Sequence, residues 1–210
     1  LIFNKFITRR KKILPKRGII ISFSGVDGCG KSTINNDISK YFKKFITVEN
    51  YHIGKPQGIL ISNIVTKVRG KIFHKEKEII RKESSLSSSL IAISLAILRN
   101  LMSKEIERKA KKGFILFVDR WPTSELNFMD GPRIYSSSNK NSIINYFCLV
   151  ESNIYKNFLR ADLCLFIQVS LETALNRNFN RKKINKETQS QIIQRFQKNY
   201  AVKPTAKKII

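Results

Sequence analysis

The sequence is short of acidic residues, cysteine, histidine and tryptophan. Among its 210 residues there are 15 Asp and Glu, three Cys, two His and one Trp. The cysteines, Cys29, Cys148 and Cys164, are scattered without a CxxC spacing, so the sequence suggests neither a disulfide framework nor a zinc site. A reducing, cytoplasmic setting fits this cysteine usage best.

Long hydrophobic runs are also missing. The most apolar segment, Leu90 to Leu98, contains Ser94 and is followed by Arg99. It is well short of the roughly 18 to 20 residues of a membrane span, so it predicts a buried helix and no membrane span. Residues 1–17 are basic, contain no acid and lack an apolar core, which excludes a secretory signal peptide. We expect them to form a basic leader or linker, and an organelle-targeting role stays open.

The scarcity of acids leaves a large positive charge. Forty Lys and Arg give a formal net charge of +25 and a pI near 10.2. The excess is spread over the chain and is not confined to the leader. Basic proteins of this size often bind polyanions, but the heavy combined use of Lys, Ile and Asn is equally well explained by a bias in codon composition. Nucleic-acid binding is therefore an open but less favoured use of the charge.

The sequence does contain an alternation of strand-length apolar runs and helical patterns. The predicted strands are residues 18–25, 45–50, 114–120 and 163–170. The first predicted helix begins after Thr33. The second covers residues 75–112 and is interrupted by the serine cluster 84–89. Three more are predicted over residues 143–158, 171–179 with Ser170 as its cap, and 187–200. The crossovers are long enough for parallel connections, so we expect one α/β domain over residues 18–210, a three-layer sandwich with a parallel sheet.

The strongest motif lies between the first strand and the first helix. Residues 25–32 match GxxxxGK followed by Ser, with the strand before and the helix after that a phosphate-binding loop requires. Glycines let backbone N–H groups turn inward around phosphate oxygens, and the helix amino terminus adds a favourable dipole. Lys31 then reaches the outer phosphates, and Ser32 ligates Mg²⁺. The expected cofactor-binding residues are Gly25, Val26, Asp27, Gly28, Cys29, Gly30, Lys31, Ser32 and Thr33.

The second motif, Asp119-Arg120, ends the predicted strand 114–120. Ligands of an open parallel sheet bind beyond the carboxyl ends of its strands, so this pair is expected beside the phosphate loop. Asp119 would hold Mg²⁺ directly or through a water, and Arg120 would pair with the transferring or accepting phosphate through its planar fork. The structural alternative is a surface ion pair or a turn. We predict catalytic roles for Lys31, Asp119 and Arg120.

The third motif is the basic segment RNFNRKK, which we expect between two helices. Phosphoryl transfer spreads negative charge over the γ-phosphate oxygens, so mobile cations that close over it lower the barrier and exclude water. In a chain this basic, a solvated face is the alternative. Arg177 and Arg181 are favoured as catalytic residues, whereas Lys182 and Lys183 fit either interpretation.

Together, GVDGCGKST, VDRWP and ALNRNFNRKK resemble, in this order, the thymidylate kinase branch of the P-loop nucleoside-monophosphate kinases, over residues 18–200. The resemblance implies a P-loop NTPase topology, ATP with Mg²⁺ as phosphoryl donor, a monophosphate acceptor and a lid. By residue type, Asp27 matches the acidic residue of the family's loop, and Asp119 and Arg120 match its DR pair. Arg177 and Arg181 match its lid arginines. Where some members have a loop arginine this chain has Gly28, which shifts the catalytic cation onto the lid.

The acceptor side departs from the family pattern. An Arg-Glu-Pro-Gly run is expected after the second strand, where this chain reads VENYHIGKP. A thymine-binding Phe and Arg are expected within SLSSSLIAISLAILRN, where Arg99 is a candidate counterpart, and Trp121 is placed either to stack on a base or to pack. The nearest likeness is to divergent thymidylate kinase-like proteins, including those found with bacterial surface-polysaccharide genes. These share a basic leader and a turn like Asp130-Gly131-Pro132-Arg133.

Three functions follow from these patterns. The leading one is a nucleoside-monophosphate kinase that transfers the ATP γ-phosphate to dTMP or a related small phosphorylated substrate. An alternative kinase phosphorylates a hydroxyl of a nucleoside or sugar and needs a carboxylate base, for which Glu49 at the end of the second strand is the candidate. A third is a basic protein that binds nucleic acid or another polyanion and keeps the loop for switching. The oligomeric state is open, with a homodimer as one option.

The chain end carries one further expectation. Family members add a final strand after the last helix, and the segment AKKII, residues 206–210, stops where that strand would begin. The sheet is therefore expected to lack an edge and part of the adenine pocket, as in a truncated or inactive copy.

Overall fold

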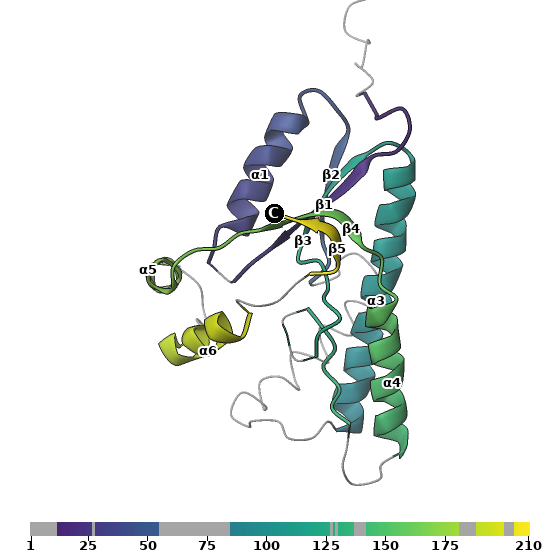
Figure 1. Cartoon of the computed structure of the whole chain (residues 1–210), viewed down its shortest axis with the longest axis vertical. Helices are drawn as coiled ribbons and strands as arrows, with labels where there is room; N and C mark the ends of the chain where they lie inside the picture. Colours follow the sequence, from purple (N-terminus) through teal and green to yellow (C-terminus); the bar gives the residue numbers. More distant parts are fainter. Residues whose placement is uncertain are drawn as a thin grey trace, which may run out of the picture.

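A parallel sheet of five strands organises the molecule. The computed structural model describes residues 12–26, 28–54, 85–126, 128, 130–136, 142–180, 188–199 and 204–210. The strands in chain order are β1 (Ile19–Ser24), β2 (Val48–His52), β3 (Ile115–Asp119), β4 (Ala161–Phe166) and β5 (Ala206–Ile209). In the sheet they lie in the order β2-β3-β1-β4-β5, and all neighbours are parallel. The helices are α1 (Lys31–Phe42), α3 (Leu86–Lys111), α4 (Ser142–Lys156), α5 (Leu171–Phe179) and α6 (Gln189–Asn199). Helix α1 covers one face of the sheet and α3, with α4 beside it, covers the other (Figure 1), which confirms the predicted three-layer α/β sandwich.

The central strands are buried on both faces, as their continuous apolar runs predict. On β3, Leu116 and Val118 belong to the core cluster that includes Ile106 of α3. The alternate residues Ile115 and Phe117 belong to the second cluster, on the α1 side of the sheet. Each large apolar side chain buried in this way stabilises the fold by roughly 1.5 to 3 kcal/mol. The two layers therefore hold β1 and β3 firmly, and the ends of these strands are a rigid base for side chains.

Two strands, β2 and β4, differ from their predicted ranges at both ends. Strand β2 begins at Val48, three residues after the predicted start, and continues to His52. Strand β4 begins at Ala161 and ends at Phe166, whereas residues 163–170 were expected. Asp162 near its start is a residue that strands usually disfavour, so the apolar pattern places the strand too late. The predicted cap of α5 is confirmed, because the Ser170 hydroxyl accepts a hydrogen bond from the Thr173 amide.

The expectation that the sheet lacks its last edge strand is wrong. Residues Ala206–Ile209 form β5, which pairs in parallel with β4. The Ile210 amide donates to the Cys164 carbonyl at 2.9 Å, and the Ile210 carbonyl accepts from the Phe166 amide at 2.7 Å. Two lysines within this segment hide the strand from an apolar pattern, although charged residues are common on edge strands.

Serines of the predicted cluster form the start of helix α3. Ser85 is the N-cap, and it exchanges hydrogen bonds with Ser88 in a capping box, in which each side chain accepts from the other residue's amide. Such a cap stabilises a helix by about 1 kcal/mol. The part of the predicted helix before Ser85 lies outside the described residues.

By length and composition alone, α3 is the one helix of the described residues that could cross a membrane. Its buried side chains include Ser89, Arg99 and Ser103 as well as apolar residues. The helix packs on β1, β3 and α4. This is the packing of a core helix, as predicted for the apolar segment Leu90–Leu98.

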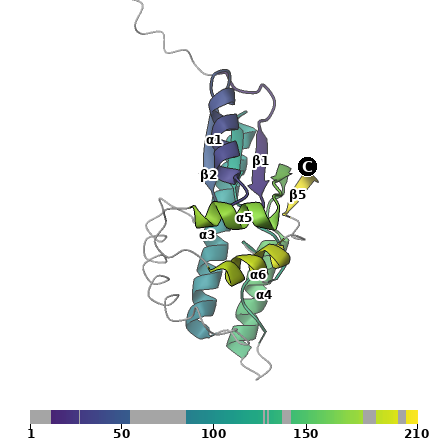
Figure 2. The same cartoon turned by 90° about the vertical axis from the view of Figure 1, so that its left-hand side faces the viewer.

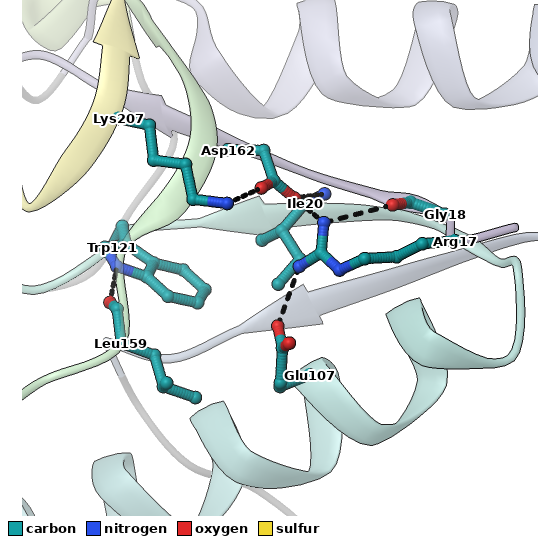
Figure 3. A network of polar contacts seen from close by, with 8 residues as sticks. All are labelled: Arg17, Gly18, Ile20, Glu107, Trp121, Leu159, Asp162 and Lys207. Carbon is teal, nitrogen blue, oxygen red and sulfur yellow. Dashed lines mark hydrogen bonds and ion pairs between the residues drawn. The ribbon is translucent and has the colours of Figure 1, made fainter.

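A polar network joins the segment before β1 to strands β4 and β5 and to helix α3 (Figure 3). The Asp162 carboxylate accepts from Arg17 Nη1 at 2.7 Å, from the Ile20 amide at 2.9 Å and from Lys207 Nζ at 2.7 Å. Arg17 also donates to Glu107 of α3 at 2.9 Å. Arg17, in the predicted leader, therefore lies against the domain. Burial alone would raise the pKa of Asp162, but the hydrogen bonds from Lys207, the Ile20 amide and Arg17 lower it below its ordinary value.

We expect Asp162→Asn to lower the free energy of unfolding by about 2 kcal/mol at pH 7, because charge-assisted hydrogen bonds to a largely buried carboxylate are lost. Since the folded-state pKa is depressed, this contribution is complete above the unfolded-state pKa of about 3.9. It disappears as the pH falls through the folded-state value. Urea unfolding of both proteins between pH 7 and pH 3 measures the difference. Glu105→Gln is the control, because its ion pair with Arg108 is exposed, and equal losses in the two variants would contradict the prediction.

Candidate active site

The loop after β1 has the backbone that its glycines predict. Gly25, Gly28 and Gly30 have φ values of 141°, 93° and 99°, a region that other residues seldom occupy. A Cβ atom at Gly25 would lie 2.3 Å from the Ile167 carbonyl oxygen, so no larger residue fits there. Gly30 is the N-cap of α1 and provides no side-chain cap. The amino end of α1 therefore points its dipole at the loop, as phosphate binding requires.

Lys31 lies inside this loop. It is the first residue of α1 and is 7% exposed. Its Nζ donates to the carbonyl oxygens of Gly25 at 2.9 Å and Val26 at 2.8 Å. Cys29 is buried, and its Sγ lies 3.7 Å from the same ammonium. A buried ammonium among backbone carbonyls is a ready partner for phosphate oxygens.

The other predicted loop residues have simpler positions. Val26 is buried beneath the loop, whereas Ser32 and Thr33 are exposed in the first turn of α1. The side chains of Ser32 and Thr33 thus lie on the helix end that the loop leads into. Asp27 lies outside the described residues.

Asp119 is the last residue of β3, and it lies opposite Phe23 of β1 in the parallel register. Because the loop begins two residues after Phe23, the carboxylate is close to it along the edge of the sheet. Oδ2 lies 3.5 Å from His52 Nδ1, and Oδ1 is buried without a hydrogen-bond partner among the described residues. A buried carboxylate oxygen without a partner is costly unless a ligand satisfies it. The position fits a cation or a water bound to one.

Arg120 has a left-handed backbone, with φ of 67°. Its amide donates to the Phe23 carbonyl at 3.2 Å, which ties the residue to the end of β1. Its side chain runs over Gly54, and Nη1 lies 3.6 Å from Asp130 Oδ2. A non-glycine residue in this conformation is uncommon, and such strained residues cluster at functional sites.

Arg177 is brought to the loop from a distant part of the sequence. It lies in the last turn of α5, inside the helix predicted over residues 171–179. Nη1 donates to the Gly28 carbonyl at 3.1 Å, and the same nitrogen is 3.5 Å from where a Cβ of Gly30 would be. Figure 2 shows α5 crossing beneath α1. The predicted partners Arg181, Lys182 and Lys183 lie outside the described residues.

Two residues considered for base recognition are internal. Arg99 has no exposed surface, and it donates to the Tyr155 hydroxyl at 2.8 Å, to Asp130 Oδ1 at 2.8 Å and to the Gly54 carbonyl at 3.2 Å. Trp121 is 2% exposed, packs edge-to-face on Phe158 and donates from Nε1 to the Leu159 carbonyl. Both side chains hold the fold together. The packing alternative for Trp121 is therefore the correct one.

Glu49, the candidate catalytic base, was expected at the carboxyl end of the second strand, but it lies near the start of β2. It is the second residue of β2 and pairs with Leu116, whereas His52 pairs with Asp119 at the site. Its carboxylate accepts from Lys109 Nζ and from the Tyr51 hydroxyl. This ion pair ties β2 to α3, away from the loop.

Asp130, in the turn Asp130-Gly131-Pro132-Arg133, belongs to the site, although the sequence pattern gives it no role there. Asp130 has φ of 69° and is 7% exposed. Its two carboxylate oxygens face Arg99 and Arg120. Only the folded chain shows this bridge, because Arg99 comes from α3, 31 residues before Asp130.

The strand order with the glycine loop after the central strand defines a class, the P-loop NTPases with the topology of nucleotide kinases. The chain belongs to the thymidylate kinase family, because the family model described as Thymidylate kinase matches residues 23–210. It is therefore an ATP-dependent nucleotide kinase, a phosphotransferase.

Individual relatives are distant. The chain is 23% identical over 171 residues to "Uncharacterized ATP-binding protein YghR" of Escherichia coli K12, covering 75% of this chain and 68% of that protein. It is 26% identical over 174 residues to a thymidylate kinase of Thermosipho africanus, covering 81% and 77%. The structure of thymidylate kinase from Candida albicans matches with a TM-score of 0.54 at 17% identity, over 92% of this chain and 83% of that one. This structural likeness supports the fold.

Proposed function

We propose that this protein transfers the γ-phosphoryl group of ATP to a nucleoside monophosphate, with dTMP or a related nucleotide as the acceptor. Family membership supports a nucleotide acceptor. The observation that carries the proposal is the approach of Arg177 to the Gly28 carbonyl at 3.1 Å, across 149 residues of sequence. It brings a cation from another element to the loop position where a catalytic charge is missing.

On the donor side, the amides of the glycine loop and the amino end of α1 would bind the β- and γ-phosphates. Lys31 would exchange the carbonyls of Gly25 and Val26 for phosphate oxygens, a stronger charge-assisted pairing in the same place. Cys29, Gly30 and Thr33 would line this half of the site.

Mg²⁺, when bound, would neutralise charge on the phosphates. Ser32 and Asp119 would hold it, with Asp27 nearby in sequence. The residues fit such a group, because Asp119 Oδ1 is buried without a partner among the described residues. Among the same residues no cluster of three or more His, Cys, Asp or Glu forms a complete cage. A site made of the Ser32 hydroxyl and the Asp119 carboxylate suits Mg²⁺, which is commonly held by one or two carboxylates and the substrate phosphates.

For the transfer itself we assign the catalytic roles to Arg120, Arg177 and Arg181. Arg177 would stabilise the charge that develops on the transferring group, and Arg120 would orient the accepting phosphate by its planar fork. A phosphate acceptor is already ionised near neutral pH, so no general base is needed. The engagement of Glu49 by Lys109 and Tyr51 accords with a mechanism of this kind.

The wider setting follows from the family and from the cysteines. Cys29, Cys148 and Cys164 are all free, which suits a reducing compartment, and we assign the protein to the cytoplasm. A homodimer and nucleic-acid binding stay predictions.

A screen of acceptors tests the proposal. We expect ADP formation with dTMP or another nucleoside monophosphate, and none with nucleosides or sugars, in a coupled assay with ATP and Mg²⁺. Buffer without acceptor and the Lys31→Ala variant give the background. Turnover with a nucleoside or sugar and with no monophosphate would overturn the proposed acceptor class.

A further inference from the structure

Asp130 connects two arginines at the acceptor end of the site. Oδ1 accepts a hydrogen bond from Arg99 Nη2 at 2.8 Å, and Oδ2 forms an ion pair with Arg120 Nη1 at 3.6 Å. The residue is 7% exposed and has a left-handed backbone, with φ of 69°. An aspartate tolerates this conformation better than most residues do, at some cost in strain.

The Arg99 side of this bridge is anchored in the helical layer. Arg99 is fully buried on α3, and its guanidinium also contacts the Tyr155 hydroxyl of α4 and the Gly54 carbonyl. The chain that follows Asp130 is fixed as well, because Glu151 of α4 accepts from the amides of Arg133 and Ile134 at 2.9 and 2.8 Å. Helices α3 and α4 therefore set the position of the Asp130 carboxylate.

The Arg120 side of the bridge is confined by Gly54. A Cβ atom at Gly54 would lie 2.4 Å from Arg120 Cδ and 3.3 Å from Arg120 Cβ. The absence of a side chain at this position lets Arg120 run over the backbone toward Asp130. Backbone and carboxylate together thus restrict a side chain that has many rotamers when it is unconstrained.

We propose that Asp130 is a positioning residue for Arg120, held in place by Arg99. The inference rests on the proposed function, in which Arg120 orients the accepting phosphate. Asp130 itself does not touch the reacting atoms. Its role is to keep the guanidinium fork preorganised, because an arginine that is correctly oriented before the substrate binds loses less freedom during the reaction.

A kinetic double-mutant cycle tests this role. We expect Asp130→Asn to lower kcat about 10- to 100-fold, the order of effect of a small misplacement, with little change in KM for ATP. In the Arg120→Ala background the same change should have almost no further effect, because the side chain to be positioned is gone. Equal effects of Asp130→Asn in both backgrounds would overturn the proposal.

Two further variants separate positioning from stability. Asp162→Asn removes a carboxylate that also lies between two cations, near the amino end of β4, and should lower the melting temperature without changing kcat. Gly54→Ala keeps Asp130 and Arg99 but displaces Arg120, so it should lower kcat as Asp130→Asn does. A normal kcat in Gly54→Ala would contradict the proposed arrangement.

A measurement without turnover distinguishes this inference from the proposed function. In protein labelled with ¹⁵N-arginine, the Nε–H signal of Arg120 can be assigned with the Arg120→Lys variant. In the presence of Asp130 this signal should be narrow and its chemical shift should differ from that of exposed arginines. We expect it to move to the averaged position of exposed arginines in Asp130→Asn and to stay unchanged in Asp162→Asn. An unchanged Arg120 signal in Asp130→Asn refutes positioning. A wild-type protein that phosphorylates no nucleotide refutes the proposed function instead.

Discussion

Lys31→Ala is expected to lower kcat/KM at least about a thousandfold, to the background of the assay. The ammonium is buried in the loop, 2.8 and 2.9 Å from two backbone carbonyls, where phosphate oxygens would replace them. Charge stabilisation of a transferring phosphoryl group by one preorganised cation commonly contributes factors of this size. Steady-state kinetics with saturating acceptor measures the loss.

The control for this variant is Lys40→Ala, which removes an exposed lysine from the same helix and should leave the kinetics unchanged. Thermal unfolding of both variants shows whether the fold is retained. Phosphoryl transfer at the wild-type rate by folded Lys31→Ala would show that the loop does not hold the donor phosphates.

Arg177→Ala is expected to lower kcat by about 100- to 1,000-fold, with a smaller change in KM for ATP. The loop contains Gly28 and no arginine, and Arg177 Nη1 reaches the Gly28 carbonyl from α5. An interaction that becomes strong only in the transition state affects kcat more than substrate binding, and loss of one such donor typically costs a factor of this order. Separate titrations of ATP and acceptor measure kcat and both KM values.

Two variants show whether charge or geometry matters at this position. Arg177→Lys keeps the charge without the planar fork and should restore only part of the rate. Arg160→Ala removes an exposed arginine elsewhere and should change nothing. A wild-type kcat in Arg177→Ala would move the catalytic cation to another residue, and the assignment to α5 would be wrong.

The backbone of the glycine loop could be predicted because its parts are adjacent in sequence. A glycine loop between a buried strand and a helix specifies its own backbone, and the positive φ values of Gly25, Gly28 and Gly30 are the expected result. Asp119 lies near the loop because the parallel register places it opposite Phe23, two residues before the loop begins. Arg177 of α5 contacts the Gly28 carbonyl, and it lies within the helix predicted over residues 171–179.

The acceptor half was harder to predict because residue type does not report burial. Arg99 was a candidate for base recognition, yet its guanidinium is completely enclosed. Glu49 was a candidate base, yet it pairs with Lys109 near the start of β2. In both cases the partner comes from another element, at sequence separations from 31 to 60 residues. A linear pattern cannot show whether such a partner is present.

By itself, the sequence determined the layered α/β fold, the phosphate loop and the class of chemistry, because strand periodicity, glycine conformation and helix capping are local properties. The tertiary structure decided the rest. It showed that AKKI forms the strand β5 beside β4, where two lysines hide the apolar pattern. It also showed that Asp130 joins Arg99 to Arg120. That bridge exists because packing of α3 and α4 against the sheet places three charges together, and burial of a charged group is stable only when such partners meet.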